Sequence, residues 1–81
     1  MNIKPLKDSV KQYLNIHKLE KKFSKAKKFF EQDTNHPSLN VELLEPKHLK
    51  VYSFRLDLKY RALFIVTDNE AEIITIINHY K

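Results

Sequence analysis

Glycine and cysteine are both absent from the 81 residues of this chain. Without cysteine, the protein can form neither a disulfide framework nor a thiolate metal site. Without glycine, it cannot contain a P-loop or a dinucleotide-binding fingerprint, because both motifs need glycine where the backbone approaches a phosphate. Asparagine, aspartate and proline must therefore form its turns.

Long apolar runs and the common catalytic motifs are missing as well. No stretch approaches the roughly 20 apolar residues of a membrane helix, and no N-terminal run resembles a signal peptide. The four histidines show no HExxH spacing, and no serine lies in a GxSxG motif. We therefore expect one soluble, cytoplasmic domain over residues 1–81, without a metal, a small-molecule cofactor or a membrane contact.

Charge is distributed unevenly along the chain, whose formal net charge is +5. Residues 1–30 contain nine lysines and two acidic residues, whereas residues 31–81 contain eight acidic residues and six lysines or arginines. A basic half attracts polyanions, most naturally nucleic acid, although an acidic protein partner or a merely solvated helix face also fits. The lysines expected to contact RNA are Lys18, Lys21, Lys22, Lys25 and Lys28.

Two helices are expected in the N-terminal half. The first contains the apolar residues Val10, Tyr13 and Leu14, with Asp8 or Ser9 as its cap. The second has apolar residues that step by four, three and four along one stripe, namely Leu19, Phe23, Ala26 and Phe30, widened by Phe29. The segment 33–40, which contains Pro37, should end this helix.

Strand patterns follow near 40–45, 50–57, 60–67 and 71–78, with Asp68-Asn69 as the turn between the last two. The last strand is apolar on both faces and is predicted to be central in the sheet. Residues 1–6 allow a short edge strand. The expected fold class is α+β: an N-terminal helical hairpin packed on a twisted, largely antiparallel sheet of about four strands.

Arg55 and Arg61 lie on the two strands of one hairpin. A three-residue loop, 57–59, would place them opposite each other on one side of the sheet, and a four-residue loop would send them to opposite faces. Opposed like charges destabilise a strand pair by about 0.2–1 kcal/mol, so the first register makes sense if both guanidiniums are kept for an anion such as phosphate. Alternatively, the arginines reach the sheet edge and pair with Asp57 or Glu42.

Other candidate site residues surround this hairpin in the expected sheet. Glu42 is a carboxylate on a strand, whereas the competing Glu45 precedes a proline and is expected in a loop. His79 follows the last strand and can exchange a proton near neutral pH, although it could also be a merely exposed histidine. Tyr80 could stack on a base or simply close the core. Lys50, at the start of strand 50–57, is a further candidate for phosphate binding.

A glutamate base, two arginines and a histidine acid form a complete set for metal-free cleavage of a phosphodiester. The carboxylate would take the proton of a ribose 2′-hydroxyl, and the arginines would stabilise charge on the phosphate. The histidine would then protonate the departing 5′-oxygen.

Three segments resemble one known protein family. "HPSLN" at 36–40, "YSFRLDLKYRALFIV" at 52–66 and "INHYK" at 77–81 resemble the RelE/ParE superfamily of type II toxin–antitoxin toxins. The R-x5-R hairpin followed by a last strand ending in His-Tyr is most similar to the YoeB-like, ribosome-dependent mRNA interferases. The resemblance implies a short strand, a helical hairpin and a twisted antiparallel sheet. It also implies an antitoxin, the ribosome and mRNA as partners.

The resemblance also implies residue roles. Glu42 matches the general base, Arg55 the phosphate-contacting arginine, Arg61 the arginine that stabilises the transition state, His79 the general acid and Tyr80 the base-contacting tyrosine. The same superfamily contains toxins that bind DNA gyrase and cleave no RNA, and a non-catalytic partner-binding homologue is a third possibility. A glutamate and a histidine together favour the nuclease, because the gyrase toxins tend to lack the full acid–base set.

Overall fold

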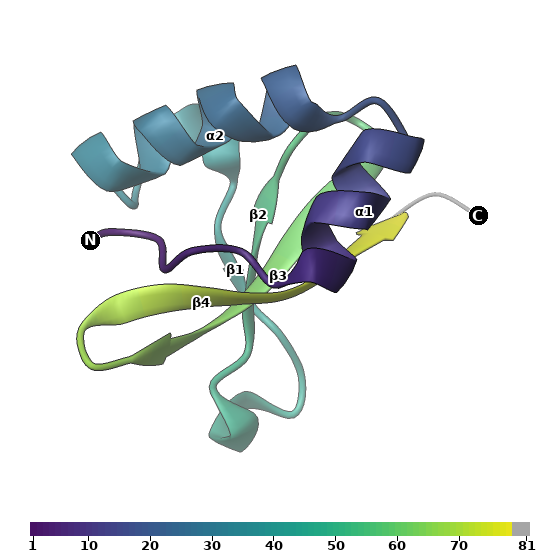
Figure 1. Ribbon diagram of the computed structural model, residues 1–81. Helices are drawn as coiled ribbons and strands as arrows, with labels where there is room; N and C mark the ends of the chain where they lie inside the picture. Colours follow the sequence, from purple (N-terminus) through teal and green to yellow (C-terminus); the bar gives the residue numbers. More distant parts are fainter. Residues whose placement is uncertain (79–81) are drawn as a thin grey trace.

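The computed structural model describes residues 1–78 and has the expected α+β fold. Its elements in chain order are α1 (Asp8–Ile16), α2 (Glu20–Gln32), the 3₁₀ turn η1 (Pro37–Leu39), β1 (Glu42–Leu43), the 3₁₀ turn η2 (Lys47–Leu49), β2 (Tyr52–Arg55), β3 (Tyr60–Thr67) and β4 (Glu70–Asn78). The strands form one antiparallel sheet in the order β1-β2-β3-β4. In Figure 1, α2 crosses above this sheet and α1 lies at its side, near β4. Neither helix of the described chain is long and apolar enough to cross a membrane.

The apolar stripe of α2 faces the sheet. All four residues of the predicted stripe are buried: Leu19, Phe23, Ala26 and Phe30. The ring of Phe30 is 5.2 Å, centroid to centroid, from both Phe54 on β2 and Phe64 on β3. Aromatic pairs at this separation add to the hydrophobic stabilisation of the core. The contacts also define the helix-covered face of the sheet as the face that carries Phe54 and Phe64.

The first helix differs from the prediction only at its start. Val10 and Leu14 are buried, as their spacing predicted. The N-cap residue is Lys7, which makes no side-chain cap, so the predicted cap at Asp8 or Ser9 is wrong. Asp8 lies instead in the first turn, where its negative charge still interacts favourably with the helix dipole.

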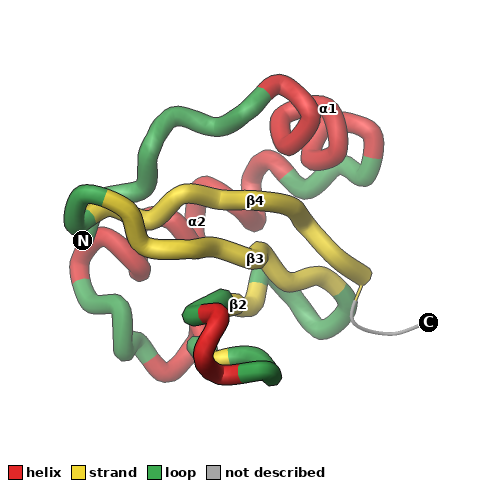
Figure 2. The backbone as a smooth tube through the Cα atoms, turned by 90° about the horizontal axis from the view of Figure 1, so that it is seen from below, coloured by secondary structure: helices red, strands yellow, loops and turns green. Residues whose placement is uncertain are grey.

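The last strand was predicted to be central, and this prediction is wrong because β4 lies at the edge of the sheet. Figure 2, which views the molecule from below, shows β4 beside β3, with α2 behind them and α1 on the outer side of β4. One face of β4 is buried, at Ala71, Ile73 and Ile76, whereas Ile74 and Ile77 are only half-buried, and two elements pack against this edge strand. Helix α1 packs against β4, and the N-terminal segment runs along its outer side through a single parallel bridge between Ile3 and Ala71. Residues 1–6 therefore contribute one bridge instead of a strand.

Left-handed backbone at polar residues sets the strand boundaries in this glycine-free chain. β1 and β2 are shorter than the predicted 40–45 and 50–57, and their later starts coincide with positive φ angles of 44° at Asn40 and 54° at Lys50. The predicted turn at Asp68-Asn69 is confirmed, with φ angles of 54° and 63°. Asparagine and aspartate tolerate this region better than other residues with a side chain, so they replace glycine here.

The hairpin between β2 and β3 has the first of the two registers considered above. Arg55 is the Cα partner of Arg61, and the backbone N–H of Leu56 donates to the carbonyl of Tyr60 at 2.9 Å, which leaves 57–59 as the loop. The Oδ1 atom of Asp57 accepts from the backbone N–H groups of Lys59 and Tyr60, both at 2.8 Å. Asp57 thus stabilises the short loop, and the loop places both arginines on one face.

Candidate active site on the helix-free face of the sheet

Strand alternation separates the candidate site from the core. Because Phe54 points toward α2, its neighbours Ser53 and Arg55 point to the opposite face of the sheet. Glu42 on β1 is the Cα partner of Ser53, and Arg61 on β3 is the Cα partner of Arg55. Directly paired residues share a face. Three of the predicted site residues, Glu42, Arg55 and Arg61, therefore lie on one helix-free face.

Arg61 is buried, with a relative exposure of 5%, and its guanidinium is held by the chain around it. The Nε atom donates to the hydroxyl of Ser53 at 2.9 Å. The Nη2 atom donates to the backbone carbonyl of Asn40 at 2.5 Å and more weakly to the carbonyl of Ser53 at 3.4 Å. A buried charge is tolerated only when it is paired and hydrogen-bonded, and these acceptors satisfy that condition.

Glu42 is placed beside Arg61 by the same backbone turn. Its Oε1 atom lies 3.8 Å from Nη2 of Arg61, and the Glu42 side chain is 48% exposed. The side-chain amide of Asn40 donates to the same Oε1 atom at 3.3 Å. Asn40 thus contacts the arginine through its carbonyl and the glutamate through its amide. The arrangement presents an accessible carboxylate next to a fixed positive charge.

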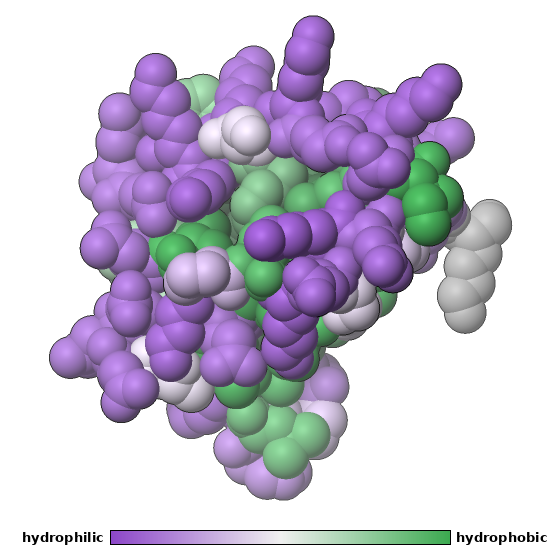
Figure 3. Space-filling view, viewed as in Figure 1, coloured by the Kyte–Doolittle hydropathy of each residue, from purple (hydrophilic) through white to green (hydrophobic). Residues whose placement is uncertain are grey.

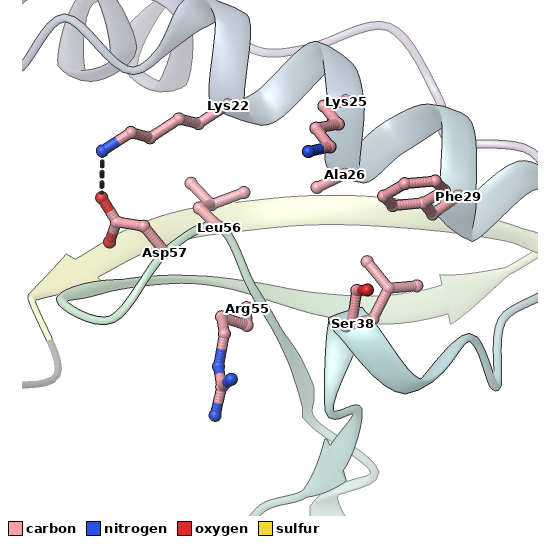
Figure 4. A pocket seen from close by; sticks show the side chains of 9 residues that line it. Lys22, Lys25, Ala26, Phe29, Ser38, Arg55, Leu56 and Asp57 are labelled. Carbon is pink, nitrogen blue, oxygen red and sulfur yellow. Dashed lines mark hydrogen bonds and ion pairs between the residues drawn. The ribbon is translucent and has the colours of Figure 1, made fainter.

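Arg55 contrasts with its partner across the hairpin. It is half-buried, and among the described residues it forms no hydrogen bond and no ion pair. Figure 4 shows its guanidinium pointing away from α2. An unpaired guanidinium of this kind is suited to an incoming anion, because its planar fork of donors matches a phosphate. The two arginines therefore have different environments: Arg61 is fixed by protein acceptors and Arg55 is available.

The environment of Arg61 also perturbs its acid–base equilibrium. Burial lowers the pKa of the Arg61 guanidinium, the carboxylate of Glu42 opposes this effect, and the positive charge of Arg55 adds to the lowering. Arginine nevertheless stays protonated in proteins, so the site keeps both positive charges. The perturbation is the electrostatic consequence of placing two guanidiniums opposite each other.

The predicted RNA-contacting lysines all lie on the exposed surface of the helical layer: Lys18, Lys21, Lys22, Lys25 and Lys28. Figure 3 shows the predominance of hydrophilic side chains over α2 at the top of the molecule. Lys18 is in the turn between the helices, with a positive φ of 55°. Lys22 pairs with Asp57 at 2.7 Å, and the ammonium of Lys25 lies 5.9 Å from the ring centre of Phe29.

The remaining candidates do not join the cluster in the described chain. Lys50 follows η2 and lines a separate cavity with Leu49, Tyr52, Ile65 and Val66. Glu45 is exposed in the loop after β1, as expected for a residue before proline. His79 and Tyr80 lie outside the described residues. Within residues 1–78, no three His, Asp or Glu side chains gather in the way a metal site requires.

Two residues of the cluster were missed by sequence reasoning, Ser53 and Asn40. Ser53 was dismissed because it has no nucleophile motif, yet it accepts the central hydrogen bond from Arg61. The two-residue spacing between Ser53 and Arg55 was a usable signal, since it places a polar side chain on the same face as the arginine. Asn40 follows Pro37 by three residues, but its contact with Arg61, 21 positions later, has no local signature.

Comparisons with known proteins agree with this fold. No protein-family model matches the chain, and no curated protein matches its sequence. It is similar to a chain of the YoeB–YefM complex from Staphylococcus aureus, with a TM-score of 0.70 and 20% identity over 99% of this chain and 100% of that one. A heterotetrameric YoeB–YefM toxin–antitoxin complex from the same organism gives the same values. The YoeB dimer from S. aureus has a TM-score of 0.70 and 22% identity over 98% of this chain and 94% of that one. This chain therefore has the fold of these YoeB structures, in agreement with the fold that the resemblance of its sequence implied.

Proposed function

We propose that this protein is the toxin of a type II toxin–antitoxin system and acts as a ribosome-dependent endoribonuclease. The observation that carries the proposal is the gathering of Glu42, Arg55 and Arg61 on one face of the sheet. Ile77 is the Cα partner of Arg61, so β4 runs beside the same site two residues before His79. The shared fold with solved toxin–antitoxin complexes supports the same assignment.

Each residue of the site has a separate role in RNA cleavage. Glu42 takes the proton of the 2′-hydroxyl, the 2′-oxygen attacks the phosphorus, and the bond from phosphorus to the 5′-oxygen breaks. Arg55 binds the phosphate, and Arg61 stabilises the charge that develops in the transition state. His79 donates a proton to the departing 5′-oxygen, and Tyr80 contacts a base. No metal takes part in any of these steps.

The partners follow from the same proposal. An antitoxin chain covers the protein and silences it, and the ribosome presents mRNA to the sheet. The exposed lysines of α2 attract ribosomal RNA, so binding should weaken as the salt concentration rises. This distribution places electrostatic attraction on the helices and chemistry on the opposite face of the sheet.

The test is mRNA cleavage in a purified translation system, followed by primer extension. Glu42→Gln, Arg55→Ala and His79→Ala should each lower cleavage at least about 100-fold, as expected for loss of a general acid, a base or a preorganised charge. Glu45→Gln is the matched control, because it removes the neighbouring exposed carboxylate and should leave cleavage unchanged. Circular dichroism confirms that each variant is folded.

Three results would overturn the proposal. Full cleavage by Glu42→Gln and His79→Ala together would remove the acid–base mechanism. Intact mRNA combined with loss of DNA supercoiling by gyrase would indicate the alternative, a gyrase-binding toxin whose basic helical hairpin carries the activity. A chain that arrests no growth and affects neither target would be a non-catalytic homologue.

A further inference from the structure

A groove opens at the side of the sheet where β2 has no partner strand. β1 pairs with β2 only at Ser53 and Tyr52, so β2 has a free edge beyond Ser53. The cavity at this edge has a volume of about 360 Å³ and is lined by α2, η1 and the end of β2. Its position connects the helical layer with the face that carries Arg55 (Figure 4).

Cationic residues border this groove on both its α2 side and its sheet side. Lys22 and Lys25 extend from α2, whereas Arg55 stands on the sheet side. Asp57 is the one acidic residue among its lining residues, and it is already paired with Lys22 at 2.7 Å. Among the described residues, Lys25 and Arg55 have no ion pair. The positive charge of Lys25 on the α2 side and that of Arg55, whose guanidinium points away from α2 at the sheet-side rim, therefore stay uncompensated.

The groove is unsuited to a stacked base. Phe29 is the aromatic side chain in its lining, and His36 stacks on that ring at 4.2 Å with an interplanar angle of 8°. The ammonium of Lys25 lies 5.9 Å from the centre of the same ring. With these two neighbours Phe29 has little free ring surface. The groove thus offers charge and the hydroxyl of Ser38 and no stacking platform.

We propose that this groove binds the sugar-phosphate backbone of the RNA strand flanking the cleaved bond, with one phosphate near Arg55 and the next near Lys25. This inference rests on the proposed nuclease function, because Arg55 belongs to both the groove and the candidate active site. A strand that leaves the active site past Arg55 crosses the free edge of β2 and meets Lys25. Since the two charges do not converge on one point, they suit successive phosphates better than a single anion.

Asp57 limits the affinity of the groove. Its carboxylate forms an ion pair with Lys22. Burial raises the pKa of Asp57, but the hydrogen bonds and the charge of Lys22, together with the backbone hydrogen bonds, lower it more, so this pKa lies below the usual aspartate value. Asp57→Asn keeps the Oδ1 acceptor for the backbone N–H groups of Lys59 and Tyr60. The substitution therefore releases Lys22 for RNA without removing the loop contacts.

The test measures binding of a fluorescent 2′-O-methyl RNA hexanucleotide, which cannot be cleaved, to the full chain at several salt concentrations. Lys25→Gln should weaken binding several-fold and reduce the slope of log K against log salt by about 0.7, the value expected for one phosphate contact on a single strand. Lys27→Gln is the matched control on α2: it removes the same charge outside the groove, from a half-buried lysine that is not among the predicted RNA contacts, and should leave the slope unchanged. Asp57→Asn should tighten binding and raise the slope by about 0.7.

A double-mutant comparison tests whether Arg55 and Lys25 contribute to RNA binding independently. If Arg55 and Lys25 contact different phosphates, the loss in Arg55→Ala/Lys25→Gln should equal the product of the two single losses. Equal effects of Lys25→Gln and Lys27→Gln on binding would refute the groove. Equally strong, Lys25-dependent competition by polyglutamate would also refute it, in favour of an acidic protein segment. The proposed nuclease function fails separately, through cleavage that persists without Glu42 and His79.

Discussion

Removing Arg61 should destabilise the protein, whereas removing Arg55 should not, although the two residues face each other across one hairpin. Arg61→Ala deletes the donor to Ser53 Oγ at 2.9 Å and to the Asn40 carbonyl at 2.5 Å. Hydrogen bonds from a charged donor contribute about 1.5–3 kcal/mol each, and a buried acceptor left unpaired adds to the loss. The ion pair with Glu42 adds little because that carboxylate is half exposed.

Partial solvation of the vacated site reduces this sum, and the loss of repulsion from Arg55 offsets another part of it. We therefore expect Arg61→Ala to lower the free energy of unfolding by about 2–4 kcal/mol, which is a large share of the stability of a small domain. Arg55→Ala removes no hydrogen bond from the described residues and relieves the same repulsion. The free energy of unfolding of this variant should therefore lie within about 1 kcal/mol of the wild-type value and slightly above it.

Urea unfolding followed by far-ultraviolet circular dichroism measures both changes, and the method suits a chain without tryptophan. Ser53→Ala serves as an internal check: in the Arg61→Ala background, its effect should be much smaller than in wild type, because its partner is already gone. Equal stability of the two arginine variants would refute the assignment of Arg61 as the fixed member of the pair. The result also matters for activity assays, since loss of toxicity in an unstable Arg61 variant would not report on catalysis.

Three further outcomes are expected. Glu42→Gln should change the free energy of unfolding by less than about 0.5 kcal/mol, because its side chain is 48% exposed, while abolishing RNA cleavage in the same sample. Phe30→Ala should lower the free energy of unfolding by about 3–5 kcal/mol in urea titrations, since Phe30 is fully buried between Phe54 and Phe64. The lowered pKa of Asp57 stabilises the fold at pH values above 3.8, the ordinary pKa, and this stabilisation is lost as the pH falls through the lower pKa of the folded protein. Asp57→Asn should therefore make the free energy of unfolding, measured by urea unfolding, depend less on pH on the acid side.

Most of the fold could be predicted from the sequence because local patterns determine it. The apolar stripe of α2 and the Asp68-Asn69 turn each express a rule that acts within a few residues. The position of β4 could not be predicted in the same way. A strand that is apolar on both faces is expected to be covered on both, but periodicity does not say whether neighbouring strands, a helix or the N-terminal segment provide the cover. In this chain α1 and the Ile3 bridge help to cover it.

The candidate site also combines a feature that local sequence predicts with one that it does not. The shared face of Arg55 and Arg61 depends on loop length alone, and the sequence limited it to two registers, one of which is observed. The burial of Arg61 depends on a carbonyl 21 residues away, presented by left-handed backbone at Asn40, and no local pattern encodes that distance. The acceptors of Ser53 and Asn40 bind the guanidinium of Arg61, whereas the guanidinium of Arg55 has no partner among the described residues. This asymmetry explains how opposed like charges are tolerated in the hairpin: the charge of Arg61 is stabilised by the protein, and the charge of Arg55 remains available for an anion.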